Sequence, residues 1–296
     1  MILDRLHILN FKSIASASCI FSPKVNCFIG LNGMGKTNML DALHYLSFTK
    51  SHLSITDSLA VRQGEEASIL EAVYKSDFGD ERQLLLQIRP GHRKILRRNK
   101  KEYTKLSEHI GAFPVVIVSP SDRDLIHEGS EARRRFLDGM LCQLSPSYLQ
   151  ALLRYNQVLS QRNGLLKLMA ERQYFDPHTL AIYDEQLALY GAPIFQERKA
   201  FLEAFLPTFQ EQYTALCQGK EQVAIDYQSP LEGGNFRELL SQSRSQDRAA
   251  QYTTVGIHKD DLSFSIAQQP VKKFASQGQQ KSFLIALKLA QFFSLY

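Results

Sequence analysis

The sequence of 296 residues has no tryptophan and few cysteines, and none of the cysteines forms a Cys-x-x-Cys pair. The four are Cys19, Cys27, Cys142 and Cys217. Such wide spacing argues against a disulfide framework or a cysteine metal site, and favours small buried hydrophobic residues in a reducing compartment. The chain also lacks an apolar run of the roughly 18 residues that a membrane span needs. Asp4, Arg5 and His7 interrupt the N-terminal segment, so it does not resemble a signal peptide. We therefore expect a cytoplasmic protein with no membrane partner.

Low-complexity tracts, internal repeats and sustained heptads are missing as well. With 44% hydrophobic and 22% charged residues, the composition is that of an ordinary globular protein with a substantial core. The formal net charge is +5, which is compatible with a polyanionic partner. Many proteins without such a partner reach the same value, so the charge alone decides no function.

The first part of the chain predicts short strands around a glycine-rich loop. Residues 2–11 nearly alternate apolar and polar side chains, as a half-buried strand does. Residues 25–29 form a short apolar run that leads into glycine, and helical spacing of apolar residues begins at Asn38. Further strands are predicted at 69–74, 83–89 and 115–118, with a hairpin across 94–103 that turns at 98–100.

After Glu131 the pattern becomes helical and then returns to strand. Helices are predicted at 132–141, 147–171, 179–192 and 195–219. Strands are predicted at 223–227 and 262–266, and a final apolar helix at 281–293. This order suggests a sheet core that is split by a helical lobe.

Residues 30–37, Gly-Leu-Asn-Gly-Met-Gly-Lys-Thr, match the P-loop pattern between a predicted strand and a helix. Glycines let successive backbone N–H groups turn toward an anion, and the helix start adds its positive dipole end. Lys36 is expected to reach the β- and γ-phosphates of ATP, and the Thr37 hydroxyl to bind Mg²⁺. A chance glycine turn is the alternative, which the Lys-Thr pair and both flanks disfavour. The predicted nucleotide-binding residues are Gly30, Leu31, Asn32, Gly33, Met34, Gly35, Lys36, Thr37 and Asn38.

A second segment, Ser-Gln-Gly-Gln-Gln-Lys at 276–281, opens the last predicted helix. A simple capped helix explains it, but Ser and Gly at a helix start also present a hydroxyl and N–H groups to an anion. Its place, late in a P-loop chain, is that of the signature segment of ATP-binding-cassette heads. In such dimers this segment closes on the γ-phosphate held by the partner. The predicted residues are Ser276, Gln277, Gly278 and Gln279, with Ser276 and Lys36 as catalytic candidates, Ser276 acting in trans.

A metal-binding carboxylate is harder to find. Phosphoryl transfer needs one, usually at the end of an apolar strand called Walker B. No such strand follows the last helix, and residues 115–118 end in Ser-Pro. We expect either that the carboxylate lies beyond Tyr296 or that this chain hydrolyses ATP poorly, so enzymatic activity stays open.

Several segments together resemble the RecF family of bacterial recombinational-repair ATPases, which belongs to the SMC-like cassette group. They are Asn10–Ser13, the P-loop with Asn38, Ser119–Asp122, Arg133–Asp138, Tyr155 to Lys167, His258–Leu262 and the signature segment. The match spans nearly the whole chain in order. Two departures stand out. The usual Gly-Pro-His reads Gly256-Ile257-His258, and the Walker B strand, its acid and a switch histidine are missing, so the chain looks C-terminally truncated.

The resemblance implies an α/β fold, an ABC-type P-loop ATPase head with a mixed β-sheet lobe and an inserted α-helical lobe. We place the ATPase lobe at 1–129 plus 252–296 and the helical lobe at 130–251. It also implies an ATP-dependent homodimeric clamp on duplex and gapped DNA, including single-strand/double-strand junctions, that assists RecA loading with RecO and RecR. Two alternatives remain: a transporter nucleotide-binding subunit, and a truncated, non-hydrolysing head that acts as an interaction module.

Basic residues supply candidates for DNA contacts. They are Arg97, Arg98, Lys100 and Lys101 on the predicted hairpin, Arg133 and Arg134 at a helix start, and Arg162 in mid-helix. Phosphate tracking explains a basic hairpin, but so does protection of a sheet edge by charge. The helix arginines also fit a solvated face or ion pairs between lobes. Asp260 and Asp261 are expected to pair with cations more readily than to hold a metal.

Overall fold

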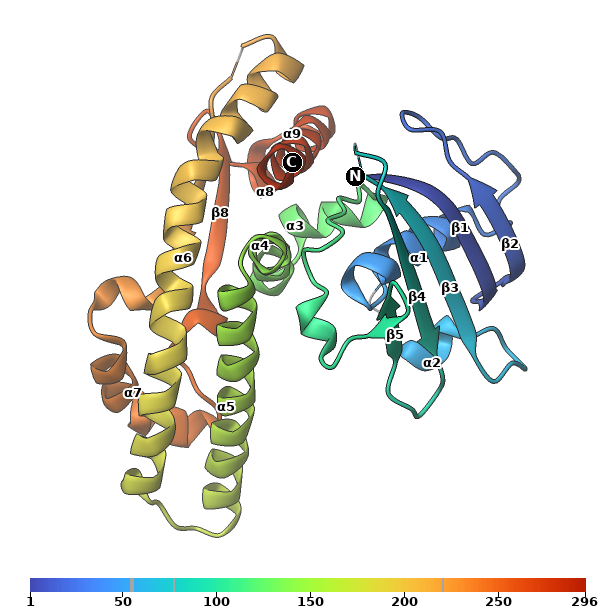
Figure 1. The fold of residues 1–296 in the computed structure, drawn as a ribbon. Helices are drawn as coiled ribbons and strands as arrows, with labels where there is room; N and C mark the ends of the chain where they lie inside the picture. Colours follow the sequence, from blue (N-terminus) through green and yellow to red (C-terminus); the bar gives the residue numbers. More distant parts are fainter. Residues whose placement is uncertain (54–55, 77, 220) are drawn as a thin grey trace. The chain divides into compact units, whose positions relative to one another are not determined.

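The computed structural model describes residues 1–296 except 54–55, 77 and 220 (Figure 1). The chain divides into two compact units, Met1–Val115 and Val116–Tyr296. Among the described residues no helix is both long and apolar enough to cross a membrane.

The first unit is built on one six-stranded sheet in the order β2-β1-β3-β4-β5-β6, in which all neighbours are antiparallel. Its strands are β1 (Ile2–Phe11), β2 (Ile14–Ile20), β3 (Ser68–Lys75), β4 (Glu81–Ile88), β5 (Ile95–Arg98) and β6 (Lys101–Glu102). Its helices are α1 (Lys36–Phe48), α2 (Asp57–Ala60) and the 3-10 turn η1 (Leu106–Glu108). The strands predicted at 2–11, 69–74 and 83–89, the hairpin and the helix after the P-loop are confirmed.

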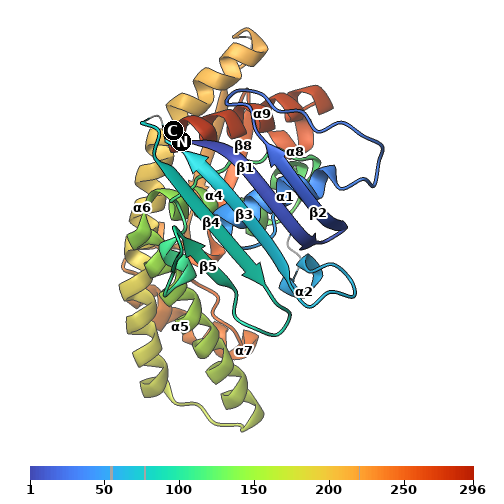
Figure 2. The ribbon, with the colours of Figure 1, turned by 45° about the vertical axis from the view of Figure 1, so that its right-hand side comes forward.

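Helix α1 packs against one face of this sheet, and Figure 2 shows β1, β3 and β4 side by side with α1 behind them. Apolar side chains point to this face because strand residues alternate between faces. Ile8, Leu70 and Leu86 are fully buried there, with Tyr45 and Leu46 of α1. The alternation in the sequence therefore predicts which face of the sheet is the core.

Two predicted strands are not part of either sheet. Residues 25–29 and 115–118 lie outside the described strands, and Val25, Ile29 and Val118 are 77%, 93% and 63% exposed. An apolar run indicates only that the segment prefers to be buried, whereas a strand also needs a neighbouring strand to which its backbone hydrogen-bonds. The sequence prediction of strands at these two places is wrong for the described structure.

The second unit combines helices with a three-stranded antiparallel sheet, β7-β8-β9. Its main helices are α4 (Ser130–Leu144), α5 (Pro146–Glu171), α6 (Pro177–Cys217), α7 (Phe236–Ala250) and α9 (Gln277–Leu295). Shorter ones are η2 (Pro120–Arg123), α3 (Asp124–His127), η3 (Pro230–Gly233), η4 (Ile257–Lys259) and α8 (Val271–Phe274). The strands are β7 (Val223–Gln228), β8 (Asp261–Ile266) and β9 (Gln269–Pro270).

Helix α6 corrects the prediction of two helices at 179–192 and 195–219. It runs for 41 residues through Pro193 and Pro207. A proline inside a helix removes a hydrogen bond and costs roughly 3 kcal/mol, which packing on both sides offsets. Leu187, Ile194 and Phe209 are fully buried, and α5 lies alongside α6 as an antiparallel partner (Figure 1).

The small sheet and α9 share an aromatic core with α6. The ring of Phe283 in α9 lies 4.9 Å from Phe209, 6.3 Å from Tyr213 and 5.2 Å from Phe264, centroid to centroid. This core fixes the start of α9, where the signature segment lies. In the division into compact units, residues 252–296 belong to the same unit as the helices. The predicted division into an ATPase lobe (1–129 plus 252–296) and a helical lobe (130–251) stays a prediction.

Candidate nucleotide-binding site

The P-loop curls around the start of α1. Gly33 and Gly35 have φ of 82° and 89°, the left-handed region that glycine enters without steric cost. Lys36 folds back over the loop, and its ammonium donates to the carbonyl oxygens of Gly30 and Leu31, each at 2.8 Å. Gly35 is the N-cap of α1, and no described side chain caps this helix start. The loop therefore presents backbone N–H groups, a helix dipole and the Lys36 ammonium to an anion.

The β1–β2 turn supports the loop from behind. A Cβ on Gly35 would lie 3.3 Å from Ile14 Cγ1, and the Asn38 amide donates to Ser13 Oγ at 2.8 Å. On the other side the loop is open, because Leu31 and Met34 are 80% and 72% exposed and Thr37 is also exposed. The residues present fit a nucleotide phosphate chain, with the Thr37 hydroxyl accessible to a metal ion.

The signature segment begins α9 with a reciprocal cap. Ser276 Oγ accepts from the Gln279 backbone N–H at 3.2 Å, and Gln279 Oε1 accepts from the Ser276 N–H at 2.7 Å. This is the capped helix that the sequence allows as its simpler interpretation. Ser276, Gln277 and Gly278 are exposed, so capping leaves them accessible. Their role at a partner's nucleotide stays a prediction, as does that of Gln279.

The basic hairpin forms as predicted, with Asn99 and Lys100 both at positive φ in its turn. Arg97, Arg98, Lys100 and Lys101 are exposed. Arg97 and Lys100 also border a hollow on the outer face of β3, β4 and β5. This surface carries accessible positive charge, and DNA contact by these four residues stays a prediction.

Arg133 and Arg134 are bound within the second unit instead of facing solvent. Arg133 makes a two-pronged bond to Asp261, with Nε–Oδ1 at 2.6 Å and Nη2–Oδ2 at 3.0 Å. Arg134 donates to the Asp260 carbonyl oxygen at 2.7 Å and to Ser130 Oγ at 2.5 Å. The structure thus favours the ion-pair interpretation for Arg133 and hydrogen bonds within the unit for Arg134. It also places Asp261 in an ion pair with Arg133, as expected.

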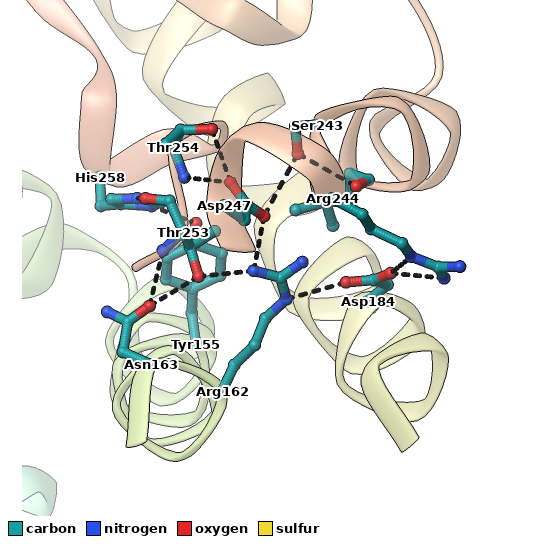
Figure 3. Close-up of polar contacts among 11 residues, drawn as sticks. Tyr155, Arg162, Asn163, Asp184, Ser243, Arg244, Asp247, Thr253, Thr254 and His258 are labelled. Carbon is teal, nitrogen blue, oxygen red and sulfur yellow. Dashed lines mark hydrogen bonds and ion pairs between the residues drawn. The ribbon is translucent and has the colours of Figure 1, made fainter. Parts of the chain in front are cut away.

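Arg162 corrects the sequence prediction more strongly. Its side chain is fully buried between α5, α6 and α7 (Figure 3). The guanidinium donates to Asp184 Oδ1 at 2.9 Å and to Asp247 Oδ2 at 2.7 Å. A third bond, to Thr253 Oγ1, is 2.9 Å long. A DNA phosphate cannot reach a cation enclosed in this way, so Arg162 is a structural residue in this conformation.

The same network holds the chain between α7 and η4. Asn163 Oδ1 accepts from the backbone and the hydroxyl of Thr253, each at 2.7 Å (Figure 3). His258 accepts from the Tyr155 hydroxyl at 2.8 Å through Nδ1 and donates to the Thr253 carbonyl at 2.9 Å through Nε2. Burial lowers the pKa of His258 to about 4, so the ring is neutral. The His258 motif is therefore anchored to helix α5.

Sequence reasoning missed a second buried arginine, Arg198 of α6. It donates to Asp260 Oδ2 at 2.6 Å, to Asp138 Oδ1 at 2.7 Å and to the Ile257 carbonyl at 2.8 Å. A signal was present, because Arg198 lies four residues after the buried Ile194 and four before Leu202 on one helix face. A lone charge on an apolar stripe indicates a buried ion pair.

The family model of the AAA ATPase domain matches residues 1–170. The DNA replication and repair protein RecF of Porphyromonas gingivalis is 50% identical over 293 residues, which cover 99% of this chain and 79% of that protein. The protein of the same name from Flavobacterium johnsoniae is 47% identical, covering 99% of this chain and 81% of that protein.

The chain belongs to the RecF family of DNA replication and repair proteins. A solved structure of the recombination mediator protein RecF with ATP, in the RecFOR pathway, superposes with a TM-score of 0.92 at 29% identity. That match covers 98% of this chain and 80% of the solved one. The Smc head domain from Pyrococcus furiosus, at 16% identity and a TM-score of 0.54, shares the fold over 98% of this chain and 78% of its own. The predicted ABC-type P-loop ATPase head and the resemblance to the RecF family are confirmed.

Proposed function

We propose that this chain binds ATP and Mg²⁺ through the P-loop. The observation that carries the proposal is the loop itself, with Gly33 and Gly35 in left-handed conformation and Lys36 folded over its mouth. On nucleotide binding the Lys36 ammonium exchanges two carbonyl oxygens for phosphate oxygens, and the backbone N–H groups of residues 33–37 donate to the same phosphates. Thr37 would hold Mg²⁺, which supplies charge neutralisation between the β- and γ-phosphates. A RecF relative of the same fold is known with ATP.

We further propose that ATP closes two copies of the chain into a clamp on DNA. In this arrangement the signature segment of one copy meets the nucleotide of the other, and Ser276, Gln277, Gly278 and Gln279 contact its γ-phosphate. The exposure of Ser276, Gln277 and Gly278 at a helix start supports this role. The clamp would bind duplex and gapped DNA, including single-strand/double-strand junctions, and assist RecA loading together with RecO and RecR. The RecFOR pathway in which the solved relative acts supports this assignment.

A nucleotide-binding head without efficient hydrolysis is the second candidate. It is suggested by the strands that the structure describes, none of which is an apolar run ending in Asp or Asp-Glu; the run Leu180–Tyr183 that precedes Asp184-Glu185 is helical. In this candidate the protein acts through ATP binding and dimerisation, and ATP hydrolysis is slow or absent.

Nucleotide titration and sedimentation with gapped duplex DNA test the proposal. The unmodified chain should bind ATP, dimerise and bind DNA more tightly with ATP than without it. Lys36→Ala should abolish all three effects, because the loop loses its cation. Lys24→Ala removes an exposed lysine of the same unit and serves as the control. Equal DNA affinity with and without ATP would refute the clamp, and ATP turnover measured on the same samples separates the two candidates.

A further inference from the structure

Lys12 and Asp41 form a buried ion pair behind the P-loop that the proposed function does not use. Lys12 Nζ lies 2.5 Å from Asp41 Oδ2, and the two side chains are 9% and 2% exposed. Lys12 occupies the turn between β1 and β2 with a left-handed φ of 51°, whereas Asp41 lies in α1. An ammonium and a carboxylate are costly to bury, so such a pair is kept only where partners compensate both charges.

The Asp41 carboxylate also binds the loop that follows α1. Its Oδ2 accepts from Ser51 Oγ at 2.8 Å, and its Oδ1 accepts from the His52 backbone N–H at 2.7 Å. Both carboxylate oxygens are thus occupied, and one residue of α1 joins the β1–β2 turn to the chain beyond the helix. Lys12 is fixed in turn by its own N–H, which donates to the Ala60 carbonyl at 2.9 Å.

The two residues after Lys12 form the floor of the P-loop. Ser13 Oγ accepts from the Asn38 amide at 2.8 Å. A Cβ on Gly35 would lie 3.4 Å from Ser13 Oγ and 3.3 Å from Ile14 Cγ1. Gly35 is the left-handed residue that turns the loop into α1. Because the floor fits closely under Gly35, a shift of the β1–β2 turn changes the direction of the loop's N–H groups.

We propose that Lys12 and Asp41 are positioning residues of the nucleotide site. The ion pair holds Ser13 and Ile14 against Gly35, and so keeps the backbone N–H groups of the loop aimed at the phosphates. Lys12 acts through Asp41 and does not touch the nucleotide, because its ammonium is held by the carboxylate. This inference rests on the proposed ATP binding, and it assigns a role to the Lys12 side chain that its place in the sequence does not reveal.

A double-mutant cycle tests the inference with ATP affinity and thermal unfolding measured on the same samples. Lys12→Met and Asp41→Asn should each weaken ATP binding about 10- to 100-fold, by analogy with the residues that orient metal ligands from behind. The ATP affinity of the double variant should be no lower than that of the single variant with the lower affinity, because both changes release the same turn. Asp41→Asn keeps an oxygen for the His52 N–H, so this variant tests the pair even if Lys12→Met folds poorly.

Lys288 and Asp122 provide a matched control in the second unit. Their ion pair is 2.8 Å long, with side chains 8% and 9% exposed. Lys288→Met should lower the unfolding temperature by about as much as Lys12→Met but leave ATP affinity unchanged. If Lys12 were merely structural, the two variants would have the same effect on ATP affinity. An equal loss of ATP affinity in Lys288→Met would therefore overturn the positioning role.

Two other results would also overturn it. If Lys12→Met weakens binding but Asp41→Asn does not, or if the two losses add fully, Lys12 contacts the nucleotide directly. If both single variants bind within twofold of the unmodified chain, the pair does not position the loop. Failure of the unmodified chain to bind ATP would instead refute the proposed function itself.

Discussion

Replacing Arg162 by leucine would remove the central cation of the polar network in Figure 3. Asp184 would keep a partner, because the Arg244 guanidinium donates to its Oδ2 at 2.7 and 2.9 Å. Asp247 would lose its cation while remaining fully buried. Breaking one side of a buried ion pair costs about 3–5 kcal/mol, because the other charge stays uncompensated. For a unit of about this size, that loss lowers the unfolding temperature by about 2–4 °C per kcal/mol.

The assay is thermal and urea unfolding of Arg162→Leu beside two further variants. Arg162→Leu/Asp247→Asn removes both charges and should recover much of the lost stability. Arg237→Leu breaks the ion pair with Glu185, whose side chains are 67% and 58% exposed, and should cost less than about 1 kcal/mol. A loss in Arg162→Leu no larger than in Arg237→Leu would refute the buried-network reasoning. DNA affinity of folded Arg162→Leu should equal that of the unmodified chain, since the buried guanidinium does not meet DNA.

Three further perturbations have defined outcomes. Gly35→Ala should abolish ATP binding in titrations, because φ is 89° and the new Cβ would crowd Ile14; the control is Gly129→Ala, where φ is −73° and no atom lies within 4 Å. Burial lowers the pKa of His258 from 6.5 to about 4. Between pH 6.5 and pH 4 this side chain is therefore protonated in the unfolded chain and neutral in the folded chain. Stability should therefore fall as the pH drops from 6.5 to 4, by about 3 kcal/mol at most, and His258→Gln should flatten that part of the urea-unfolding profile. Replacing Arg98, Lys100 and Lys101 by alanine should reduce the slope of log affinity for DNA against log salt by about 0.9 for each phosphate that these residues neutralise; an unchanged slope would place DNA elsewhere.

Local patterns in the sequence predict most of the elements because their causes are local. The alternation in residues 2–11 and the helical spacing after Asn38 both reflect one buried face. The P-loop is predictable for the same reason, since its glycines and Lys36 act on their own backbone. The cap at Ser276 likewise needs only the next turn of helix.

The errors arise where the deciding partner is distant in the sequence. Residues 25–29 have the composition of a strand but lie outside the described strands. The sequence leaves Arg162 and Arg133 open between DNA contact, a solvated face and ion pairing, because their carboxylate partners Asp247 and Asp261 lie 85 and 128 positions away. Periodicity can indicate that a charged side chain is buried, as for Arg198, but it does not identify the partner, because charge pairing needs no sequence spacing. Lys12 is the same case in the first unit, since the turn that contains it gives no hint of Asp41.

The departure at Ile257 from the Gly-Pro-His pattern shows how the structure decides what a motif residue does. Ile257 is the first residue of η4 and is 1% exposed. Its carbonyl oxygen accepts from Arg198 at 2.8 Å, a bond that a proline carbonyl makes equally well. Proline also suits the first position of a helical turn, and the preceding Gly256 has an extended ψ of 177° that proline tolerates. Ile257→Pro should therefore cost about 0.5–1.5 kcal/mol of unfolding free energy, the range for removing one carbon from a buried side chain. Gly256→Ala, whose Cβ would lie 2.4 Å from the Tyr155 hydroxyl at a φ of 140°, should cost considerably more. If Ile257→Pro is the more damaging of the two, the isoleucine side chain or its N–H toward Tyr155, both of which proline removes, carries the role of this position.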